Sequence, residues 1–153
     1  MKNRPWQIVS MAFAVAVLAG CATSSSPATS ASSTTSTTTS LEGSSWRLVQ
    51  IAMSDGVTRP AIERSRYTIG FGKDGVLNVR FDCNRGRGSW TSSGPGNLEF
   101  GPLALTRALC PTGSLHDELV RQWPHVRSYL IKDGRLYLSL MADGGTIEFE
   151  PAP

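Results

Sequence analysis

Apolar and polar residues alternate through the middle of the chain in the pattern of a β-hairpin. Between Tyr67 and Phe71 every second residue is large and apolar, which is the period of a strand with one buried face. Lys73-Asp74-Gly75 has the composition of a turn, and the alternation resumes over residues 77–83. The pattern predicts that Cys83 lies on the buried face of the second strand and that Asp82 lies on the other face.

Other short segments complete a set of strands. The three C-terminal strands are joined by tight turns containing Asp and Gly. The glycine-rich stretch 84–88 is predicted to be an irregular corner between strands. We predict the further strands at 46–51, 89–92, 97–100, 128–132, 135–141 and 146–150.

One segment has the signature of a helix. Ser114 and Asp117 fit a capping box at its start. Apolar residues then recur at helical spacing as far as Trp123, and Pro124 ends the pattern. Because many short strands accompany one helix without alternating with it, the predicted fold class is α+β, mostly antiparallel β. We expect a single small domain over residues 41–151, a curved sheet or partly open barrel with one helix.

The start of the chain has the signature of an export signal. Basic residues precede an apolar run at 8–18, which is too short for a membrane-spanning helix of about 20 residues. The run leads into Leu18-Ala19-Gly20-Cys21, which resembles the lipobox of bacterial lipoproteins. The resemblance implies a signal peptide over 1–20 and a lipid anchor, such as palmitate, on Cys21. The alternative is an ordinary signal cleaved near Ala22.

Residues 21–40 are predicted to be a tether between this anchor and the domain. The stretch 22–40 is almost entirely Ser and Thr, so it cannot bury a core. As a flexible coil it would span roughly 25 Å. Because Ala22 rather than Asp follows Cys21, resemblance to Gram-negative lipoproteins favours the outer membrane of the cell envelope, with the domain facing the periplasm.

The charge balance argues against nucleic acid as a partner. The chain has 15 Lys and Arg against 12 Asp and Glu. Lys2 and Arg4 belong to the predicted signal peptide, which leaves the remainder close to neutral.

Two cysteines remain if Cys21 is acylated. In an oxidising envelope compartment, Cys83 and Cys110 are most simply a disulfide. The alternative is a metal site that includes His116, since thiolates and imidazole are suitable ligands. The spacing is not that of a zinc finger and no fourth ligand is evident, so we predict no metal and no cofactor.

Arginines surround the predicted corner at 84–88. Guanidinium groups suit phosphate or carboxylate, so Asn84, Arg85 and Arg87 are candidates for binding an anion or a partner. The alternative is a solvated hairpin face that Asp82 balances. The other arginines that could gather at this corner are Arg80 and Arg107.

No catalytic arrangement is recognisable, and we predict that the protein is not an enzyme. The sequence has no nucleophile elbow, no zinc-protease helix and no phosphate loop. His116 and His125 are expected to be ordinary surface histidines. Trp46, Trp90 and Trp123 are expected to be core residues, although a partly open barrel could also present them to an acyl chain.

Four separated pieces of the sequence resemble the META domain family, which includes the heat-inducible HslJ-type lipoproteins. They occur in order along nearly all of 41–150. The resemblance implies a partly open antiparallel barrel in an envelope setting linked to stress response or secretion, and no established catalysis. The pieces are Leu41–Leu48, Cys83-Asn84-Arg85 with Gly88, Thr106–Cys110, and Leu136-Tyr137-Leu138 with Phe149.

Two positions depart from the family pattern. The family usually has glycine before its Cys-Asn pair, where this chain has Asp82, and Tyr is common at the position of Trp90. The local backbone around Cys83 is therefore expected to differ in detail from its relatives.

Two functional hypotheses follow from these observations. The first is a non-catalytic envelope lipoprotein that binds a protein or another envelope component during stress or secretion. The second is a carrier or sensor for a lipid or another small apolar ligand held inside the barrel. A cavity lined by Leu, Phe and Trp would favour the second hypothesis, and a filled interior would favour the first.

Overall fold

The structure is a computed structural model that describes residues 40–153. The predicted signal peptide, Cys21 and all of the predicted tether before Ser40 lie outside the described residues. Among residues 40–153, no helix has both the length and the apolar character needed to cross a membrane.

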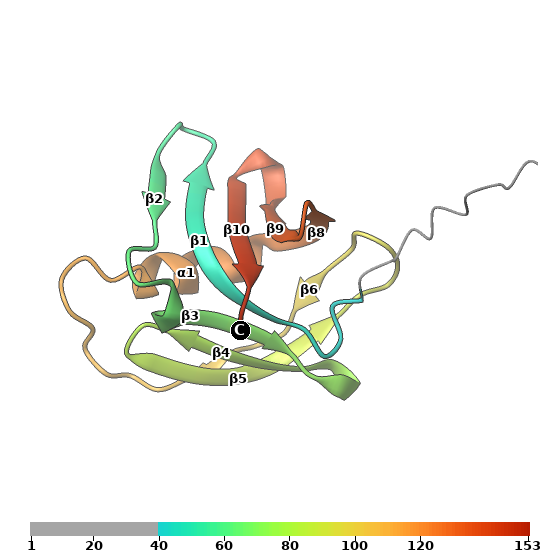
Figure 1. Cartoon of the computed structure of the whole chain (residues 1–153), viewed down its shortest axis with the longest axis horizontal. Helices are drawn as coiled ribbons and strands as arrows, with labels where there is room; N and C mark the ends of the chain where they lie inside the picture. Colours follow the sequence, from blue (N-terminus) through green and yellow to red (C-terminus); the bar gives the residue numbers. More distant parts are fainter. Residues whose placement is uncertain (1–39) are drawn as a thin grey trace, which may run out of the picture. The chain divides into compact units, whose positions relative to one another are not determined.

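Ten strands form one antiparallel sheet that curls into a nearly closed barrel (Figure 1). Along the sheet the order is β6-β5-β4-β3-β1-β10-β9-β8, with β2 paired to β1 and β7 paired to β5. The strands are β1 Ser45–Met53, β2 Thr58–Pro60, β3 Tyr67–Phe71, β4 Val76–Phe81, β5 Asn84–Thr91, β6 Glu99–Phe100, β7 Ala104–Leu105, β8 Val126–Lys132, β9 Arg135–Leu140 and β10 Gly145–Pro151.

The two ends of the sheet meet and close the barrel. The Leu98 N–H donates to the Arg127 carbonyl at 3.1 Å, and Asn97 forms an isolated bridge with Ser128. The predicted α+β class, mostly antiparallel and with one helix, is confirmed. That helix is α1 His116–Gln122, and single 3₁₀ turns occur at η1 Arg64–Arg66, η2 Lys73–Gly75, η3 Trp123–His125 and η4 Met141–Asp143.

The predicted hairpins form where the alternation is strongest. β3 pairs with β4 through Ile69 opposite Val79, around the turn at η2. The three C-terminal strands pair in sequence, as their turn residues predict. Each strand directs its apolar residues into the barrel, so the core consists of aromatic and aliphatic side chains such as Phe71, Phe81 and Phe149.

The tryptophans belong to this core, as expected. Trp46 and Trp123 are buried, and Trp123 stacks on Phe100 with 4.1 Å between ring centroids. Trp90 is half-buried, and its indole N–H points at the carbonyls of Gly72 and Val76, at 3.3 and 3.1 Å.

The predicted corner at 84–88 is a strand instead, because β5 runs without a break from Asn84 and the turn lies at Asp82 and Cys83. Its glycines allow another segment to approach closely. A Cβ on Gly86 would lie 2.6 Å from the Ala104 carbonyl oxygen, and one on Gly88 would lie 2.9 Å from that of Pro102. Glycine here marks contact between backbones rather than a bend.

Helix α1 begins without the predicted capping box. Its N-cap is Leu115, and no side chain caps it. Ser114 instead accepts a hydrogen bond from the His116 N–H at 3.2 Å, while Asp117 is 95% exposed. The helix ends as predicted, since Pro124 falls in the 3₁₀ turn η3 that follows it.

Candidate functional site

The turn between β4 and β5 contains a left-handed residue. Asp82 has φ +61°, a conformation that costs a non-glycine residue roughly 1–2 kcal/mol. Glycine adopts this conformation freely, which explains the glycine that the family pattern places here. The left-handed step also breaks the alternation, so Asp82 is buried and Cys83 only half-buried, the reverse of the prediction.

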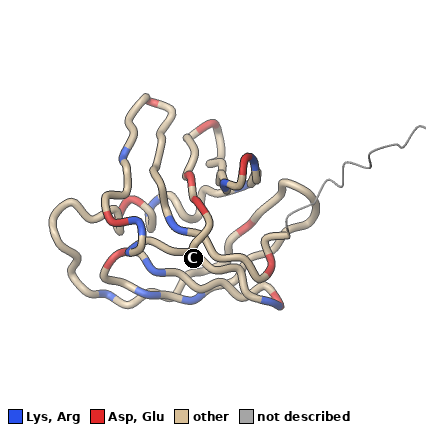
Figure 2. The backbone as a smooth tube through the Cα atoms, viewed as in Figure 1, with Lys and Arg blue, Asp and Glu red and all other residues tan. Residues whose placement is uncertain are grey.

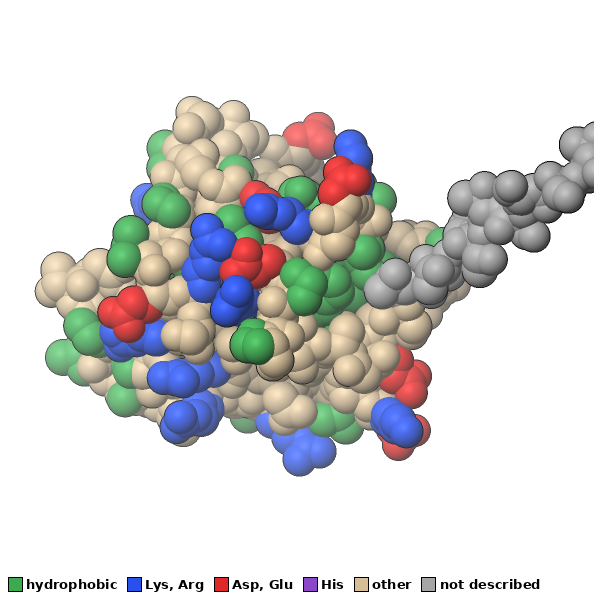
Figure 3. Space-filling model, in the orientation of Figure 1, with side chains coloured by type: hydrophobic (Ala, Val, Ile, Leu, Met, Phe, Trp, Pro, Cys, Tyr) green, Lys and Arg blue, Asp and Glu red, His purple; other side chains and the backbone are tan. Residues whose placement is uncertain are grey.

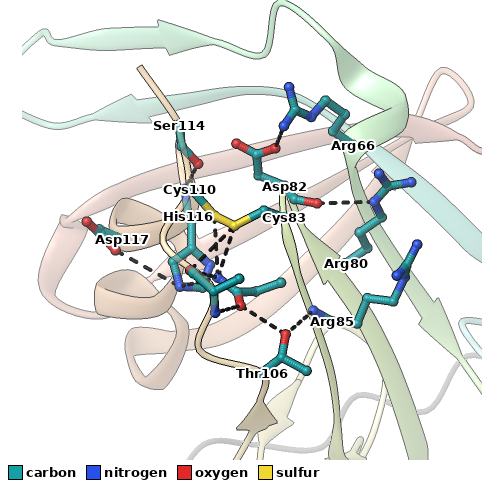
Figure 4. Close-up of a disulfide and its surroundings, with 12 residues drawn as sticks. Arg66, Arg80, Asp82, Cys83, Arg85, Thr106, Cys110, Ser114, His116 and Asp117 are labelled. Atoms are coloured by element: carbon teal, nitrogen blue, oxygen red, sulfur yellow. Dashed lines mark hydrogen bonds and ion pairs between the residues drawn. A yellow bond between two sulfur atoms is a disulfide. The ribbon is translucent and has the colours of Figure 1, made fainter. Parts of the chain in front are cut away.

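The buried carboxylate of Asp82 has two partners. It accepts a hydrogen bond from the Tyr67 hydroxyl at 3.3 Å and forms an ion pair with Arg66 (Figure 4). The Tyr67 oxygen in turn accepts from the Leu115 N–H at 3.0 Å. Asp82 therefore links the β4–β5 turn to the start of helix α1.

Cys83 and Cys110 form the predicted disulfide, with their Cα atoms 5.5 Å apart and a sequence separation of 27. Their sulfurs are bonded to each other and are not thiolate ligands for a metal at His116. Within residues 40–153, no three His, Cys, Asp or Glu side chains are grouped so as to hold a metal ion.

Asn84 fastens the segment that carries Cys110. Its side chain is fully buried, and its oxygen accepts from the Thr106 hydroxyl at 2.9 Å and the Ala108 N–H at 2.8 Å. Its nitrogen donates to the Ala108 carbonyl at 3.0 Å. Asn84 therefore makes its hydrogen bonds within the domain and is not available to a partner. Arg85 and Arg87, the other two candidates from the sequence, are exposed.

His116 lies beside this disulfide and not on the open surface. Its side chain is 16% exposed, and its Nε2 is 3.3 Å from the Asn84 amide nitrogen. The buried Nδ1 has no partner among the described residues. His125, by contrast, is exposed as expected.

Arginines line up across the outer surface of β4 and β5. Arg80 and Arg85 are direct cross-strand neighbours, and Arg87 lies opposite Asn78 one step further along. Arg85 and Arg87 are exposed, and among the described residues neither forms an ion pair. We call Arg80, Arg85 and Arg87 the arginine face. Figure 4 shows Arg80 and Arg85 extending to the same side of the sheet, away from the disulfide.

Two arginines on β1 and η1 differ, because a carboxylate neutralises them. Arg47 and Arg64 both bind Glu150, at 2.6 and 2.7 Å. Burial by itself raises the pKa of Glu150, but the hydrogen bonds from Arg64 and Arg47 outweigh it and hold the pKa below its usual range. Among the described residues, three neighbouring arginines on β4 and β5 are therefore without an ion pair, as are Lys73, Arg107, Arg127 and Lys132 elsewhere. Figure 2 shows several blue segments together along these strands.

An apolar groove lies at the opening of the barrel, beside helix α1. It has a volume of about 440 Å³ and is lined by side chains that include Phe100, Leu103, Leu105 and Trp123. Behind it the barrel is filled with core side chains, twelve of which are almost completely buried. The groove is a surface feature and not the internal cavity that a carrier would need.

Two exposed aliphatic residues were missed by the sequence analysis. Leu109 is 99% exposed and Ile62 is 90% exposed. Both lie outside the strands and the helix predicted from the sequence, and that was the only signal available.

Comparison with known proteins places the chain in one family. The META domain model matches residues 39–153. A search of curated proteins finds no match. Solved structures share the fold: a protein from Burkholderia xenovorans, studied by NMR, has a TM-score of 0.61 and 23% sequence identity over 73% of this chain and 83% of that one.

A crystal structure of a DUF4847 family protein from Bacteroides vulgatus is also similar. Its TM-score is 0.53 with 14% identity, and the match covers 71% of this chain and 92% of that one. These identities establish a shared fold and carry no functional information. Since the family model spans the whole described domain, this chain belongs to the META domain family.

Proposed function

We propose that this chain is an envelope lipoprotein whose META domain is a non-catalytic binding module for an anionic envelope partner. The META domain family is not a known enzyme family. The membrane attachment rests on the lipobox-like residues before Cys21. The outer membrane and a role in stress response or secretion follow from the resemblances given above.

The arginine face is the observation that carries the binding role. Like charges directly opposite on neighbouring strands destabilise a sheet, and Arg80 and Arg85 are such a pair. The sheet elsewhere supplies carboxylates to its arginines, as Glu150 does for Arg47 and Arg64. A surface that retains like charges side by side gains stability when a phosphate or carboxylate binds between them.

A titration of the full chain in neutral detergent micelles tests this role. Inorganic pyrophosphate and an Asp-rich peptide are added separately, and the Nε–H signals of Arg80, Arg85 and Arg87 are followed by NMR. We expect saturable shifts that weaken with salt, and in an Arg85→Gln/Arg87→Gln variant we expect the shift of the remaining Arg80 signal to be lost. The control is Lys73→Gln/Lys132→Gln, which removes the same charge from two turns outside the arginine face.

Equal weakening in both variants would show only a dependence on net charge and would refute a specific site. An unchanged titration in the arginine variant would place anion binding elsewhere. A fall in melting temperature confined to the arginine variant would mean that these side chains stabilise the fold instead.

The apolar groove supports a second candidate function, the binding of a small apolar ligand. Its volume of about 440 Å³ lies within the range of about 300–1,000 Å³ found for ligand pockets. Trp123 lines the groove, so an apolar ligand there should alter tryptophan emission. A Leu105→Gln change should abolish that response, and a response that persists would place the ligand elsewhere.

A further inference from the structure

Two aliphatic side chains project from the same end of the domain. Leu109, 99% exposed, belongs to the segment between β7 and α1, the orange segment that forms the left edge of Figure 1. Ile62, 90% exposed, follows β2. Residues 111–115 line a hollow together with Ile62, and Pro111 lines another together with Leu109. We call the set of Ile62, Leu109 and residues 111–113 the aliphatic end.

Leu109 is held in an exposed position because both of its neighbours in sequence are bonded to the rest of the domain. The N–H and carbonyl of Ala108 are bound by the buried side chain of Asn84, at 2.8 and 3.0 Å. Cys110 is tied to Cys83 by the disulfide. The exposure of Leu109 is therefore a fixed feature of the domain, although burying such a side chain would stabilise it.

Hydrogen bonds also hold the backbone on both sides of Ile62. The preceding Ala61 is buried, and its N–H donates to the Val49 carbonyl at 2.9 Å. The turn η1 that follows is closed by the Arg66 N–H, which donates to the Glu63 carbonyl at 3.0 Å. Both aliphatic side chains are thus presented by backbone that needs no reordering when a partner binds.

Basic side chains border the aliphatic end. Arg107 precedes Leu109 by two residues, and Arg85 is bound at its backbone to Thr106. Arg64 and Arg66 follow Ile62, but they are paired with Glu150 and Asp82, so Arg85 and Arg107 are the basic side chains here without an ion pair among the described residues. The exposed carboxylates nearby in sequence are Glu63 and Asp117, since Asp82 is buried. Figure 3 shows blue side chains gathered on the lower left of the molecule, with green side chains at its left margin.

We propose that the aliphatic end inserts into the headgroup region of an anionic membrane, with the arginine face and Arg107 binding lipid phosphates. This inference rests on the proposed function, because the same arginines supply the anion binding. Aliphatic tips bordered by arginines match a bilayer interface, where apolar side chains enter about 5–10 Å and cations meet lipid phosphates. The tether predicted from the sequence, with an expected span of roughly 25 Å, would keep such a surface within reach.

The composition of this end favours a membrane over a protein. Protein hot spots are enriched in Trp, Tyr and Arg, whereas Leu is under-represented. The aliphatic end has no Trp or Tyr at its tips, and all the tryptophans of the described domain serve the core. A fully exposed leucine instead resembles an anchor for acyl chains.

The test uses the full chain reconstituted in bicelles that contain spin-labelled lipid. One set of bicelles contains phosphatidylglycerol, and the other contains only phosphatidylcholine. With the label in the acyl chain, we expect the methyl signals of Leu109 and Ile62 to broaden in the anionic bicelles. The methyls of Leu130, which is 55% exposed on β8, should stay sharp and serve as the internal control.

Variants separate the two parts of the proposal. Leu109→Ser/Ile62→Ser should abolish insertion while leaving the shifts caused by pyrophosphate intact. Arg85→Gln/Arg87→Gln should weaken both, with vesicle affinity reduced roughly fivefold for each arginine. Lys73→Gln/Lys132→Gln should alter neither.

Other outcomes refute one proposal at a time. Broadening of Arg85 by a headgroup label, with Leu109 and Ile62 unaffected by the acyl label, would keep anion recognition and overturn insertion. No broadening in any bicelle, with the Asp-rich peptide still binding, would assign the arginine face to a protein and overturn membrane docking. Insertion that is equal in neutral bicelles and in the arginine variant would overturn the role of the arginines.

Discussion

Replacing Asp82 with glycine or with alanine should separate the two effects that this residue combines. Both changes remove the carboxylate that binds Arg66 and Tyr67. Only the alanine variant retains a side chain at φ +61°. We expect both variants to be less stable than the natural chain, and the alanine variant to be the less stable of the two.

The magnitudes follow from the surroundings of Asp82. Loss of an acceptor for the buried Tyr67 hydroxyl costs about 1–3 kcal/mol. The Arg66 side chain is 31% exposed, so water can replace part of its ion pair. Alanine in the left-handed region costs about 1–2 kcal/mol more than glycine. Because the natural Asp82 already carries that cost, the alanine variant should be less stable than the natural chain by about 2 kcal/mol, and the glycine variant, which relieves the cost, by about 1 kcal/mol or less.

Thermal and urea unfolding of the three proteins measures this difference. For a domain of about 100 residues, 1 kcal/mol corresponds to about 4–8 °C in Tm. The matched control is Asp133, which also has positive φ, at +52°, but is exposed in the β8–β9 turn. There the glycine and alanine variants should differ by a similar amount, and the alanine variant should unfold close to the natural chain.

Two results would refute this reasoning. Equal stability of the Asp82→Gly and Asp82→Ala variants would show that the left-handed backbone carries no cost in this turn. An alanine variant as stable as the natural chain would show that the carboxylate contributes nothing through Arg66 and Tyr67.

Three further predictions concern separate parts of the chain. Reducing the Cys83–Cys110 disulfide should cost roughly 3–4 kcal/mol for a loop of 27 residues, and intact mass should reveal two alkylatable thiols only after reduction. Because the folded pKa of Glu150 lies below its ordinary value of 4.5, its stabilising effect is present above that pH and is lost as pH falls through the lowered pKa. Glu150→Gln should therefore be less stable at neutral pH, with the gap closing in acid; a gap constant with pH would contradict the ion pairs. Cys21→Ser should abolish incorporation of a labelled fatty acid while Ser24→Ala retains it, and labelling of the Cys21→Ser chain would disprove the lipid attachment.

Much of the barrel could be predicted because its hairpins are encoded locally. The alternation in β3 and the tight turns between β8, β9 and β10 specify their pairing without reference to distant residues. The first part of β5, residues 84–88, was predicted as a corner because Gly86 and Gly88 remove the alternation that marks a strand, whereas its end was predicted within the strand 89–92. Its glycines fit the approach of Ala104 and Pro102, which lie well over ten residues further along the chain.

The candidate site could be predicted only in part, for a related reason. The disulfide follows from a count of cysteines, and the positions of Arg85 and Arg87 on an exposed face follow from their spacing. The burial of Asp82 and Asn84 does not follow, because one left-handed residue reverses the faces that alternation assigns. The glycine expected before Cys83 was the available sign of that reversal.

The side chain of Asn84 explains how a segment can leave the sheet and still display Leu109 rigidly. β7 pairs with β5 over only two residues, Leu105 and Ala104. Beyond them, the Asn84 amide offers Ala108 one acceptor and one donor, as a peptide unit of a neighbouring strand would. The side chain thereby continues the pairing after the strand has ended, and the disulfide secures the next residue but one. Because a buried amide and a covalent bond hold this segment, it needs no apolar anchor of its own, and Leu109 is left free to face outward.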